Sequence, residues 1–385
     1  MDALKGLKVI ELGQLIAGPF AGKTLAEFGA DVIKIEPQEA GDPLRKWRLL
    51  REGTSVWWEV QSRNKRSVAL DLRSAEGQSV VRELAREADV VIENFKPGTL
   101  EKWGIGWDVM HALNPRLIML RISGYGQTGP YRHKPGFGVL GEAMGGLRHL
   151  TGEPGRVPVR CGISIGDTLS ALHGVIGVLT ALYHRDARGG EGQVVDVALY
   201  ESVFNVMESL LPEYDAFGAV RERSGSALPG IAPTNAYRCA DGKYALVAGN
   251  GDSIFKRLMA TIGRPDLEND PALARNDGRV ARVDEIDAAI EAWTATKPLD
   301  EVLAILDDAD VPAGKVYAVD DIARDPQYLA REMIVDAVTS DGSVLKVPGI
   351  VPKLSATPGR IAHPAPRLGE HNADVAAAGG WPERR

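Results

Sequence analysis

The sequence LKVIELGQLIAGPFAGKTLAEFGADVIKI, residues 7–35, decides the fold class of this chain. Residues 7–12 and 31–35 are short runs of β-forming apolar residues, and residues 17–28 between them have helical spacing. The alternation continues, with strands predicted at residues 67–70, 89–92 and 116–122 and a helix at residues 76–87. Strands that alternate with helices form right-handed βαβ units, so a mostly parallel sheet is predicted, with ligands beyond the carboxyl ends of its strands.

The pattern changes after residue 217. Residues 218–233 are rich in Gly, Ser, Pro and charge, which is typical of a linker. Residues 234–330 are predicted to form a smaller domain, with a hairpin at residues 235–248 around Asp241-Gly242 and helices at residues 284–294 and 299–306. Residues 331–385 are expected to pack back on the first domain. The predicted fold class is α/β: a large Rossmann-like domain with a parallel sheet begins with residues 1–217, and a smaller α+β domain follows.

Composition narrows the class of protein. The 385 residues are 44% hydrophobic and 25% charged, as in ordinary globular proteins, and the net charge of −7 argues against nucleic acid or an anionic membrane as a partner. The two cysteines, Cys161 and Cys239, have no C-x-x-C spacing, so neither a disulfide framework nor a cysteine zinc site is expected. No signal peptide and no run of 18 uncharged apolar residues is visible, which predicts a cytoplasmic enzyme.

A carboxylate stands at the start of a long apolar segment, in Gly162-Ile163-Ser164-Ile165-Gly166-Asp167. Where a helix begins, its dipole favours the ionised form of Asp167, and an ionised, partly desolvated carboxylate is a nucleophile. Two other interpretations stay open: Asp167 is only an N-cap, or the G-x-S-x-G pattern before it is a hydrolase nucleophile elbow. The elbow needs a later acid and then a histidine, and no later histidine stands in a recognisable triad setting.

Two strand-to-helix junctions are candidate ligand sites. In Gly13-Gln14-Leu15-Ile16-Ala17-Gly18-Pro19 the proline suits the first turn of a helix and leaves the N–H groups of Ile16 and Ala17 available to bind an oxyanion, although a simple helix start explains the same residues. Glu93-Asn94-Phe95-Lys96-Pro97-Gly98, with Lys102 after it, suits a phosphorylated nucleotide that carries a flexible arm. A solvated loop is the alternative there.

A third glycine-rich segment, Gly124-Tyr125-Gly126-Gln127-Thr128-Gly129, satisfies the G-x-G-x-x-G pattern. Pro130 and Pro135 prevent the uninterrupted helix whose start would hold a pyrophosphate. A turn-rich loop is predicted instead of a dinucleotide site.

Short motifs in a fixed order, over nearly the whole chain, resemble the class III CoA-transferases. They are Leu7-Lys8-Val9-Ile10-Glu11-Leu12, Ala17-Gly18-Pro19, Gly29-Ala30-Asp31-Val32-Ile33-Lys34-Ile35-Glu36, Gly41-Asp42, Asn64-Lys65-Arg66-Ser67, Glu93-Asn94-Phe95, Pro97-Gly98, Gly166-Asp167 and Leu368-Gly369-Glu370-His371. The resemblance implies that Asp167 is the nucleophile and forms first an aspartyl anhydride and then an aspartyl-CoA thioester. It implies an oxyanion site near Ile16 and Ala17, CoA and acyl-CoA as substrates, and no metal or permanently bound cofactor.

The resemblance also implies which residues touch CoA. Carried over position by position, they are Ile16, Ala17, Leu70, Arg73, Asn94, Phe95, Lys96 and Lys102. Some members have glutamine in place of Ile16 and arginine in place of Pro37, so two side-chain contacts are expected to be lost here. The glycine loop of formyl-CoA transferase has no counterpart near residues 225–233, which argues against oxalate chemistry.

Two alternatives share the fold that the resemblance implies. α-Methylacyl-CoA racemases remove and replace a proton with a histidine and an aspartate, and Phe137 stands where that histidine is found. Because a phenyl ring cannot accept a proton, CoA transfer is favoured over racemisation. A non-catalytic CoA-binding module is the other alternative.

Residues 141–149, 151–156 and 159–162 resemble enzymes that move CoA from succinyl-CoA to malate, citramalate, itaconate or mesaconate. The candidate acceptor-binding residues are Phe137, Arg148, His149 and Arg160, of which the basic ones match a distal carboxylate and equally suit surface salt bridges. The resemblance further implies an interlocked homodimer. Small residues at Ser170, Gly174, Gly177 and Ala181 would allow close packing, either between subunits or within one.

Overall fold

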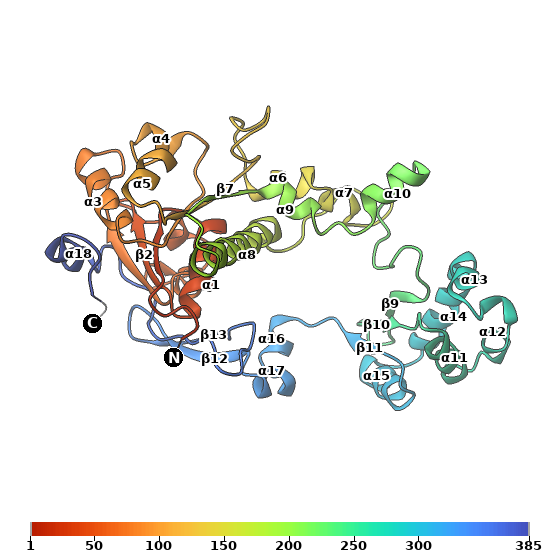
Figure 1. Ribbon diagram of the computed structural model, residues 1–385. Coiled ribbons are helices and arrows are strands. Elements are labelled where there is room, and N and C mark those ends of the chain that lie inside the picture. Colours follow the sequence, from red (N-terminus) through yellow and green to blue (C-terminus); the bar gives the residue numbers. More distant parts are fainter. Residues whose placement is uncertain (1, 384–385) are drawn as a thin grey trace. The chain divides into compact units, whose positions relative to one another are not determined.

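The computed structural model describes residues 2–383, which divide into two compact units (Figure 1). The first unit takes in the described parts of Met1–Arg148, Cys161–Ala219 and Gln327–Arg385. The second unit consists of His149–Arg160 and Val220–Pro326.

A parallel sheet of six strands, in the order β5-β2-β1-β6-β7-β8, forms the centre of the first unit. Its strands are β1 (Lys8–Glu11), β2 (Asp31–Glu36), β5 (Lys65–Ala69), β6 (Val90–Glu93), β7 (Ile118–Ser123) and β8 (Val194–Ala198). The predicted parallel α/β sheet and five of its strands are confirmed. The strand β8 was not predicted, because the exposed Asp196 interrupts its short apolar run at the sheet edge.

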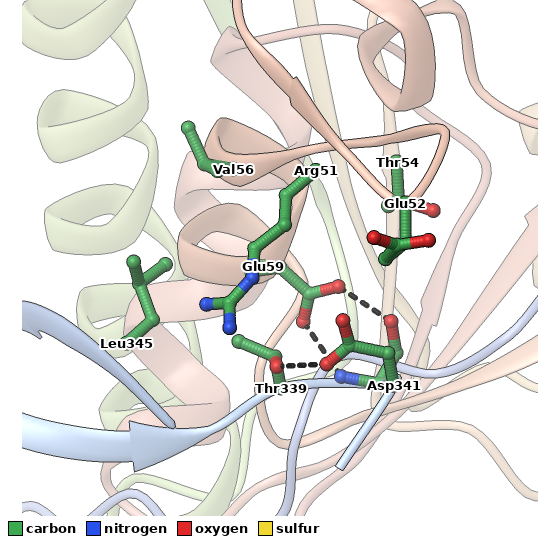
Figure 2. Close-up of a pocket in the computed structure, with 9 residues that line it drawn as sticks. Arg51, Glu52, Thr54, Val56, Glu59, Thr339, Asp341 and Leu345 are labelled. Carbon is green, nitrogen blue, oxygen red and sulfur yellow. Dashed lines mark hydrogen bonds between the residues drawn. The ribbon is translucent and has the colours of Figure 1, made fainter. Parts of the chain in front are cut away.

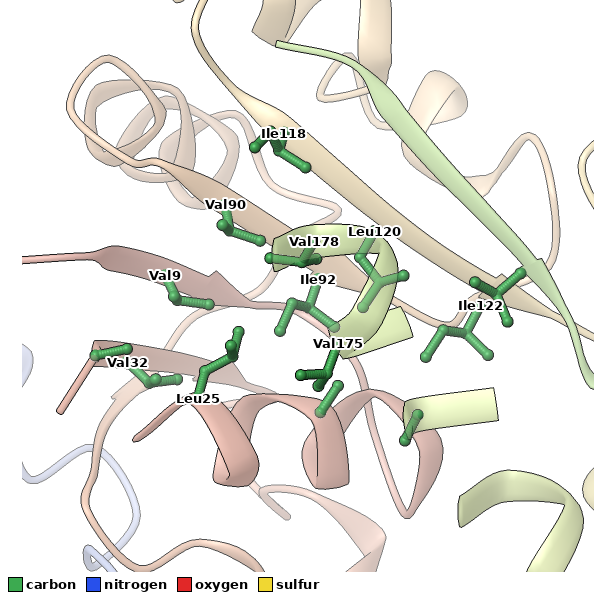
Figure 3. Packing of buried hydrophobic residues seen from close by; sticks show 14 of the residues in the cluster. Val9, Leu25, Val32, Val90, Ile92, Ile118, Leu120, Ile122, Val175 and Val178 are labelled. Carbon is green, nitrogen blue, oxygen red and sulfur yellow. The ribbon is translucent and has the colours of Figure 1, made fainter. Parts of the chain in front are cut away.

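Helices cover both faces of this sheet. On one face α1 (Ala17–Glu27) and α8 (Ile165–Ala187) pack on side chains such as Val9, Ile92 and Leu120 (Figure 3). On the other face α3 (Ala75–Ala85), α5 (Trp107–Leu113) and α18 (Asn372–Ala378) cover the alternate side chains of the same strands. Strands buried on both faces explain the continuous apolar runs in the sequence.

The small residues of α8 face the sheet of their own chain. A Cβ atom added to Gly174 would lie 2.9 Å from Leu120 Cδ2, and one added to Gly177 would lie 2.5 Å from Val195 Cγ1. Of the two interpretations of the small-residue face, packing within one subunit therefore holds. Within residues 2–383, α8 is also the one helix long and apolar enough to cross a membrane, by length and composition alone, and 44% of its most apolar window is buried inside the protein.

The remaining elements of this part of the chain are short. They are η1 (Pro43–Lys46), β3 (Leu50–Arg51), β4 (Thr54–Ser55), α2 (Val56–Gln61), α4 (Thr99–Lys102), α6 (Gly138–Met144), α7 (Leu147–Leu150), α9 (Leu199–Phe204), α10 (Leu210–Phe217), α17 (Pro326–Ala330), β12 (Ile334–Val338) and β13 (Val344–Pro348). The β12–β13 hairpin lies against α2, where the Ser340 N–H donates to Glu59 Oε2 at 3.0 Å (Figure 2).

The second unit has its own sheet and core. Its strands β9 (Thr234–Arg238), β10 (Tyr244–Ala248) and β11 (Ala313–Lys315) pair antiparallel in the order β11-β10-β9. The helices around this sheet are α11 (Asp252–Thr261), α12 (Pro265–Glu268), η2 (Pro271–Leu273), α13 (Asn276–Ala281), α14 (Val283–Thr294), α15 (Leu299–Asp308) and α16 (Val319–Ile322). The predicted hairpin is confirmed, and Gly242 takes the positive φ of +79° that its turn requires.

Candidate active site

The two halves of the parallel sheet diverge between β1 and β6, which are paired neighbours. The helix that follows β1 covers one face of the sheet, and those that follow β6 cover the other. In such sheets the crevice at the carboxyl ends of these two strands is the usual ligand site. The two candidate ligand loops, residues 13–19 and 93–98, begin at this crevice, and hydrogen bonds between Gln14 and Asn94 place them side by side.

Asn94 joins the two loops. Its Oδ1 accepts from the Gln14 N–H at 2.8 Å, and its Nδ2 donates to the Gln14 carbonyl at 2.9 Å. The loops also come close because Gly13 has no side chain: a Cβ there would lie 3.0 Å from Asn94 Oδ1. The Asn94 amide is thus used within the protein, and its contact with CoA stays a prediction.

The loop after β1 turns sharply at Leu15 and then enters α1. Leu15 has a φ of +64°, and its N–H donates to both carboxylate oxygens of Asp42 at 3.1 Å. The N–H groups of Ile16 and Ala17 come next, in the first turn of α1, where an α-helix offers no backbone partner. Gln61 Nε2 donates to the Ile16 carbonyl at 3.0 Å, which fixes the same turn from the other side.

Four charged residues close to this loop are buried, namely Glu11, Lys34, Asp42 and Lys65. Lys34 Nζ lies 2.8 Å from Asp42 and 3.0 Å from Glu11, and Lys65 Nζ lies 2.7 Å from Glu11. Burial alone would raise the pKa of Asp42 and lower the pKa of Lys34; their mutual attraction reverses both shifts, so both are charged at neutral pH. For Lys65 burial prevails and lowers the pKa to about 8.

Asp167 is the third residue of α8, which begins at Ile165 after the N-cap Ser164. The interpretation of Asp167 as the N-cap is therefore wrong, because Ile165 and Gly166 already have helical conformation. The half-buried carboxylate still lies in the first turn, where the helix dipole favours negative charge.

Gly138, the first residue of α6, lies directly against the Asp167 carboxylate. A Cβ atom at Gly138 would stand 2.1 Å from Asp167 Oδ2, which no packing allows. Gly166 is similarly close, since its Cβ would lie 3.1 Å from the Gly138 carbonyl oxygen. The sequence analysis missed Gly138 as a site residue; the signal available was its place in Pro135-Gly136-Phe137-Gly138, beside the exposed Phe137.

The other residues predicted to touch CoA lie along the same edge of the sheet. Phe95 packs edge to face on Trp103, with ring centres 5.3 Å apart, and Lys96 and Lys102 are exposed on either side of the α4 turn. Leu70 and Arg73 follow β5, three strands away from β6 in the sheet. The half-buried Leu70 lines a cavity of about 350 Å³ between α3 and α18, and the exposed Arg73 pairs with Asp71 at 2.9 Å.

A second buried ion pair holds the loop after β6. Arg121 Nε donates to Glu93 Oε1 at 2.7 Å and its Nη1 to Glu101 Oε1 at 2.8 Å, while Glu93 Oε2 accepts from the Phe95 N–H at 2.8 Å. Burial raises the pKa of Glu93 to about 7, because it outweighs the Arg121 guanidinium. The shared Arg121 instead holds the pKa of the more exposed Glu101 below its usual value, against the opposing effect of burial.

The four candidate acceptor residues are distributed over both units. Phe137 precedes α6 and is exposed, and Arg148 Nε lies 3.6 Å from the buried Glu142 carboxylate at the end of the same α6 region. His149 and Arg160 belong to the second unit, where His149 Nε2 lies 3.4 Å from Glu222 and Arg160 is exposed. Phe137 is the chain neighbour of Gly138, which lies against the Asp167 carboxylate.

Two further observations concern other possible sites. Across residues 2–383 there is no group of three or more His, Cys, Asp or Glu side chains that could hold a metal ion. A small pocket of about 30 Å³ lies between the β3–β4 turn and the β12–β13 hairpin, with Glu59, Thr339 and Asp341 in its wall (Figure 2). Its lining includes none of the predicted site residues.

A Rossmann-like sheet with a hydrogen-bonded loop at its central crevice, together with a carboxylate in the first turn of a core helix, is an arrangement typical of an α/β enzyme that binds its ligand at the strand ends. The chain belongs to CoA-transferase family III, whose profile matches residues 4–372. It is 48% identical, over 97% of its length and 92% of the relative, to succinyl-CoA–D-citramalate CoA-transferase of Chloroflexus aurantiacus.

Two other proteins complete the comparison. The chain is 42% identical to the succinyl-CoA–L-malate CoA-transferase beta subunit of Chloroflexus aurantiacus, over 97% of this chain and 93% of that one. Its structure matches the crystal structure of a CAIB/BAIF family protein from Brucella suis with a TM-score of 0.86 and 38% identity, over 98% of this chain and 99% of that chain. The predicted family and enzyme class are thereby confirmed.

Proposed function

We propose that this enzyme moves CoA from succinyl-CoA to a small dicarboxylate through covalent intermediates on Asp167. An Asp167 oxygen attacks the thioester carbonyl, the carbon–sulfur bond breaks, and CoA thiolate leaves a mixed anhydride. The thiolate attacks the aspartyl carbonyl, succinate leaves, and an aspartyl-CoA thioester remains. The acceptor carboxylate then reverses both steps and takes the CoA.

The observation that carries this proposal is the position of the Asp167 carboxylate. It lies in the first turn of α8, where the dipole favours the ionised form, and against Gly138, whose missing side chain leaves room for the carboxylate. An acid that served only to cap the helix would not need a glycine at that position of α6. Each attack creates an oxyanion, for which the N–H groups of Ile16 and Ala17 are the proposed donors.

The same geometry argues against racemisation. A proton transfer at the α-carbon needs a second acid–base group beside Asp167, and Phe137 stands where the racemases carry their histidine. We therefore assign Phe137 to acceptor binding, together with Arg148, His149 and Arg160. The names of the two Chloroflexus relatives favour citramalate or malate as the acceptor.

An adduct experiment tests the covalent step. Wild-type protein incubated with succinyl-CoA should gain a borohydride-reducible adduct on Asp167, seen by mass spectrometry, and the Asp167→Asn variant should gain none. CoA transfer by that variant should fall by at least about 10⁴-fold, since a carboxamide is no nucleophile. Deuterium uptake at the α-carbon without any acceptor, and no adduct, would instead support a racemase.

An acceptor panel tests the substrate. With succinyl-CoA as the one donor, citramalate and malate should be used with a higher kcat/KM than itaconate, mesaconate or glutarate. A preference for a monocarboxylate would contradict the role of the basic acceptor residues.

We also propose that these reactions take place in the cytoplasm.

A homodimer is proposed from the outer face of α8. Opposite the small residues that pack on the sheet, α8 exposes Leu172, Ile176, Leu179 and Tyr183, and Ile176 is 61% exposed. An apolar stripe of this length on a core helix is typical of a covered interface. Light scattering should give twice the chain mass for the wild type, and Ile176→Asp should lower that mass.

A further inference from the structure

We propose that Asp42 is a positioning residue for acyl transfer, which holds Leu15 in its left-handed conformation and so aims the Ile16 and Ala17 N–H groups at the reacting carbonyl. The inference rests on the function proposed above and deepens it. It gives a role to Asp42, which entered the sequence pattern only as part of the Gly41-Asp42 motif.

The backbone of Leu15 needs outside support. A φ of +64° is unfavourable for a residue with a Cβ, and leucine has no polar side chain to stabilise itself there. Asp42 supplies the support, because both its oxygens accept from the Leu15 N–H at 3.1 Å. Hydrogen bonds to a carboxylate are stronger than those to neutral acceptors, so this contact can offset the cost of the turn.

Asp42 is itself held rigidly. It is completely buried, lies 2.8 Å from Lys34 Nζ, and accepts from the Leu44 N–H at 2.9 Å. Its own N–H donates to Glu36 Oε2 at 2.9 Å. A carboxylate with these partners has one orientation, and it transmits that orientation to Leu15.

Lys34, the cation that pairs with Asp42, also holds the loop two residues before Leu15. Lys34 Nζ donates to the Gly13 carbonyl at 2.8 Å, Asn94 takes both backbone groups of Gln14, and Asp42 takes the Leu15 N–H. Three consecutive residues are therefore fixed before the chain reaches Ile16. Donors that stabilise an oxyanion act best when they are aimed in advance, and this bracing supplies such preorganisation.

The test compares acylation with CoA binding. Asp42→Ala should slow the formation of the Asp167 adduct from succinyl-CoA about 30-fold, less than the loss of a whole oxyanion donor. The Kd for CoA, measured by calorimetry, should change less than about threefold, because the N–H groups of the loop change direction more than position. Asp42→Asn keeps one acceptor for Leu15 and should fall between the wild type and Asp42→Ala.

A second variant separates aiming from folding. Glycine adopts positive φ without the cost that leucine pays, so Leu15→Gly in the Asp42→Ala background should recover about fivefold in acylation rate. Glu27→Gln is the matched control: it removes a buried carboxylate, 2.6 Å from Arg63 at the far end of α1, and should lower Tm with acylation within about threefold of wild type.

Each outcome has one meaning. A wild type that forms no adduct refutes the proposed function. A wild type that forms it, with Asp42→Ala at the same rate or with no recovery by Leu15→Gly, refutes only the positioning role. Should Asp42→Ala fail to fold, Asp42→Asn decides, because an acylation rate equal to wild type in that folded variant, with and without Leu15→Gly, also overturns the role.

Discussion

The two halves of the candidate site are held in opposite ways. The loop of residues 13–17 is braced by buried polar groups, with Lys34, Asp42 and Asn94 bonded to successive backbone atoms. Asp167 is positioned by missing side chains, since glycines at positions 138 and 166 let α6 and α8 meet. The proposed oxyanion donors are therefore held by directional hydrogen bonds, whereas the place of the proposed nucleophile depends on close packing.

This difference predicts different sensitivities. A hydrogen-bonded brace loses its effect when one polar atom is removed, and its charges make it depend on pH. The close packing at Gly138 depends on volume, so it cannot admit one extra methyl group, and that methyl group has no charge to titrate. Mutations on the two sides should thus be distinguishable by volume and by pH.

Among substitutions that leave Asp167 itself in place, the largest expected effect is that of Gly138→Ala. The new Cβ would stand 2.1 Å from Asp167 Oδ2, so the carboxylate must rotate out of its present position. Because a displacement of about 1 Å costs about 100-fold in a positioned reaction, kcat should fall by that factor. The Kd for CoA should stay within about threefold, and the loss should be the same at pH 6 and pH 8, since the added methyl group carries no charge.

Gly145→Ala is the control from the same segment. Its Cβ would lie 2.6 Å from the Val203 side chain, so the variant should lose stability through overpacking while kcat falls less than about fivefold. Equal losses of kcat in the two variants would show that general packing of α6, and not the Asp167 contact, limits the reaction.

The sheet could be predicted from the sequence because its signals are local. The apolar runs of β1 and β2 and the helical spacing between them lie within residues 7–35. The two ligand loops followed from the rule about strand ends. The partners of those loops could not be predicted, because the reach of Asp42 to Leu15 depends on the pairing of β1 with β2 and on the turn that follows β2.

The nucleophile shows the same division. The helix dipole and the family motif both point to Asp167, but only the structure shows that it is the third residue of α8 and not its N-cap. The open question of the small residues on α8 also needed the structure. Only the fold brings Gly174 against Leu120 of the same chain.

A second prediction tests the pH dependence of the polar side. Burial raises the pKa of Glu93 from an ordinary 4.5 to about 7, so between these values the folded chain keeps a proton that the unfolded chain loses. The free energy of unfolding therefore falls as pH rises through this window, by at most about 3 kcal/mol. Glu93→Gln cannot titrate, so urea unfolding at pH 5 and pH 8 should show a smaller difference than wild type.

Glu101→Gln is the control for Arg121. Arg121 lowers the pKa of Glu101, so that carboxyl contributes stability above its unfolded pKa and loses it only at lower pH. The variant should reduce the difference between pH 5 and pH 8 only slightly, because the charge of Glu101 is the smallest of the effects that act on the pKa of Glu93. An unchanged difference in Glu93→Gln would mean that Glu93 is already ionised at pH 5 and that Arg121 outweighs burial.

The smallest effect, Asn94→Ala, sharpens the comparison most, because it separates two roles of one residue. The variant loses both hydrogen bonds to Gln14, worth about 1–2 kcal/mol together, and its acylation rate should fall about tenfold. If Asn94 only holds the loop, the acylation rate falls and the Kd for CoA is unchanged. If Asn94 contacts CoA directly, as the family resemblance implies, the Kd for CoA rises and the acylation rate is unchanged. Asn94→Asp keeps an acceptor for the Gln14 N–H but places a carboxylate against the Gln14 carbonyl. It should therefore acylate no faster than Asn94→Ala if both bonds hold the loop, and at the wild-type rate if Asn94 serves only CoA.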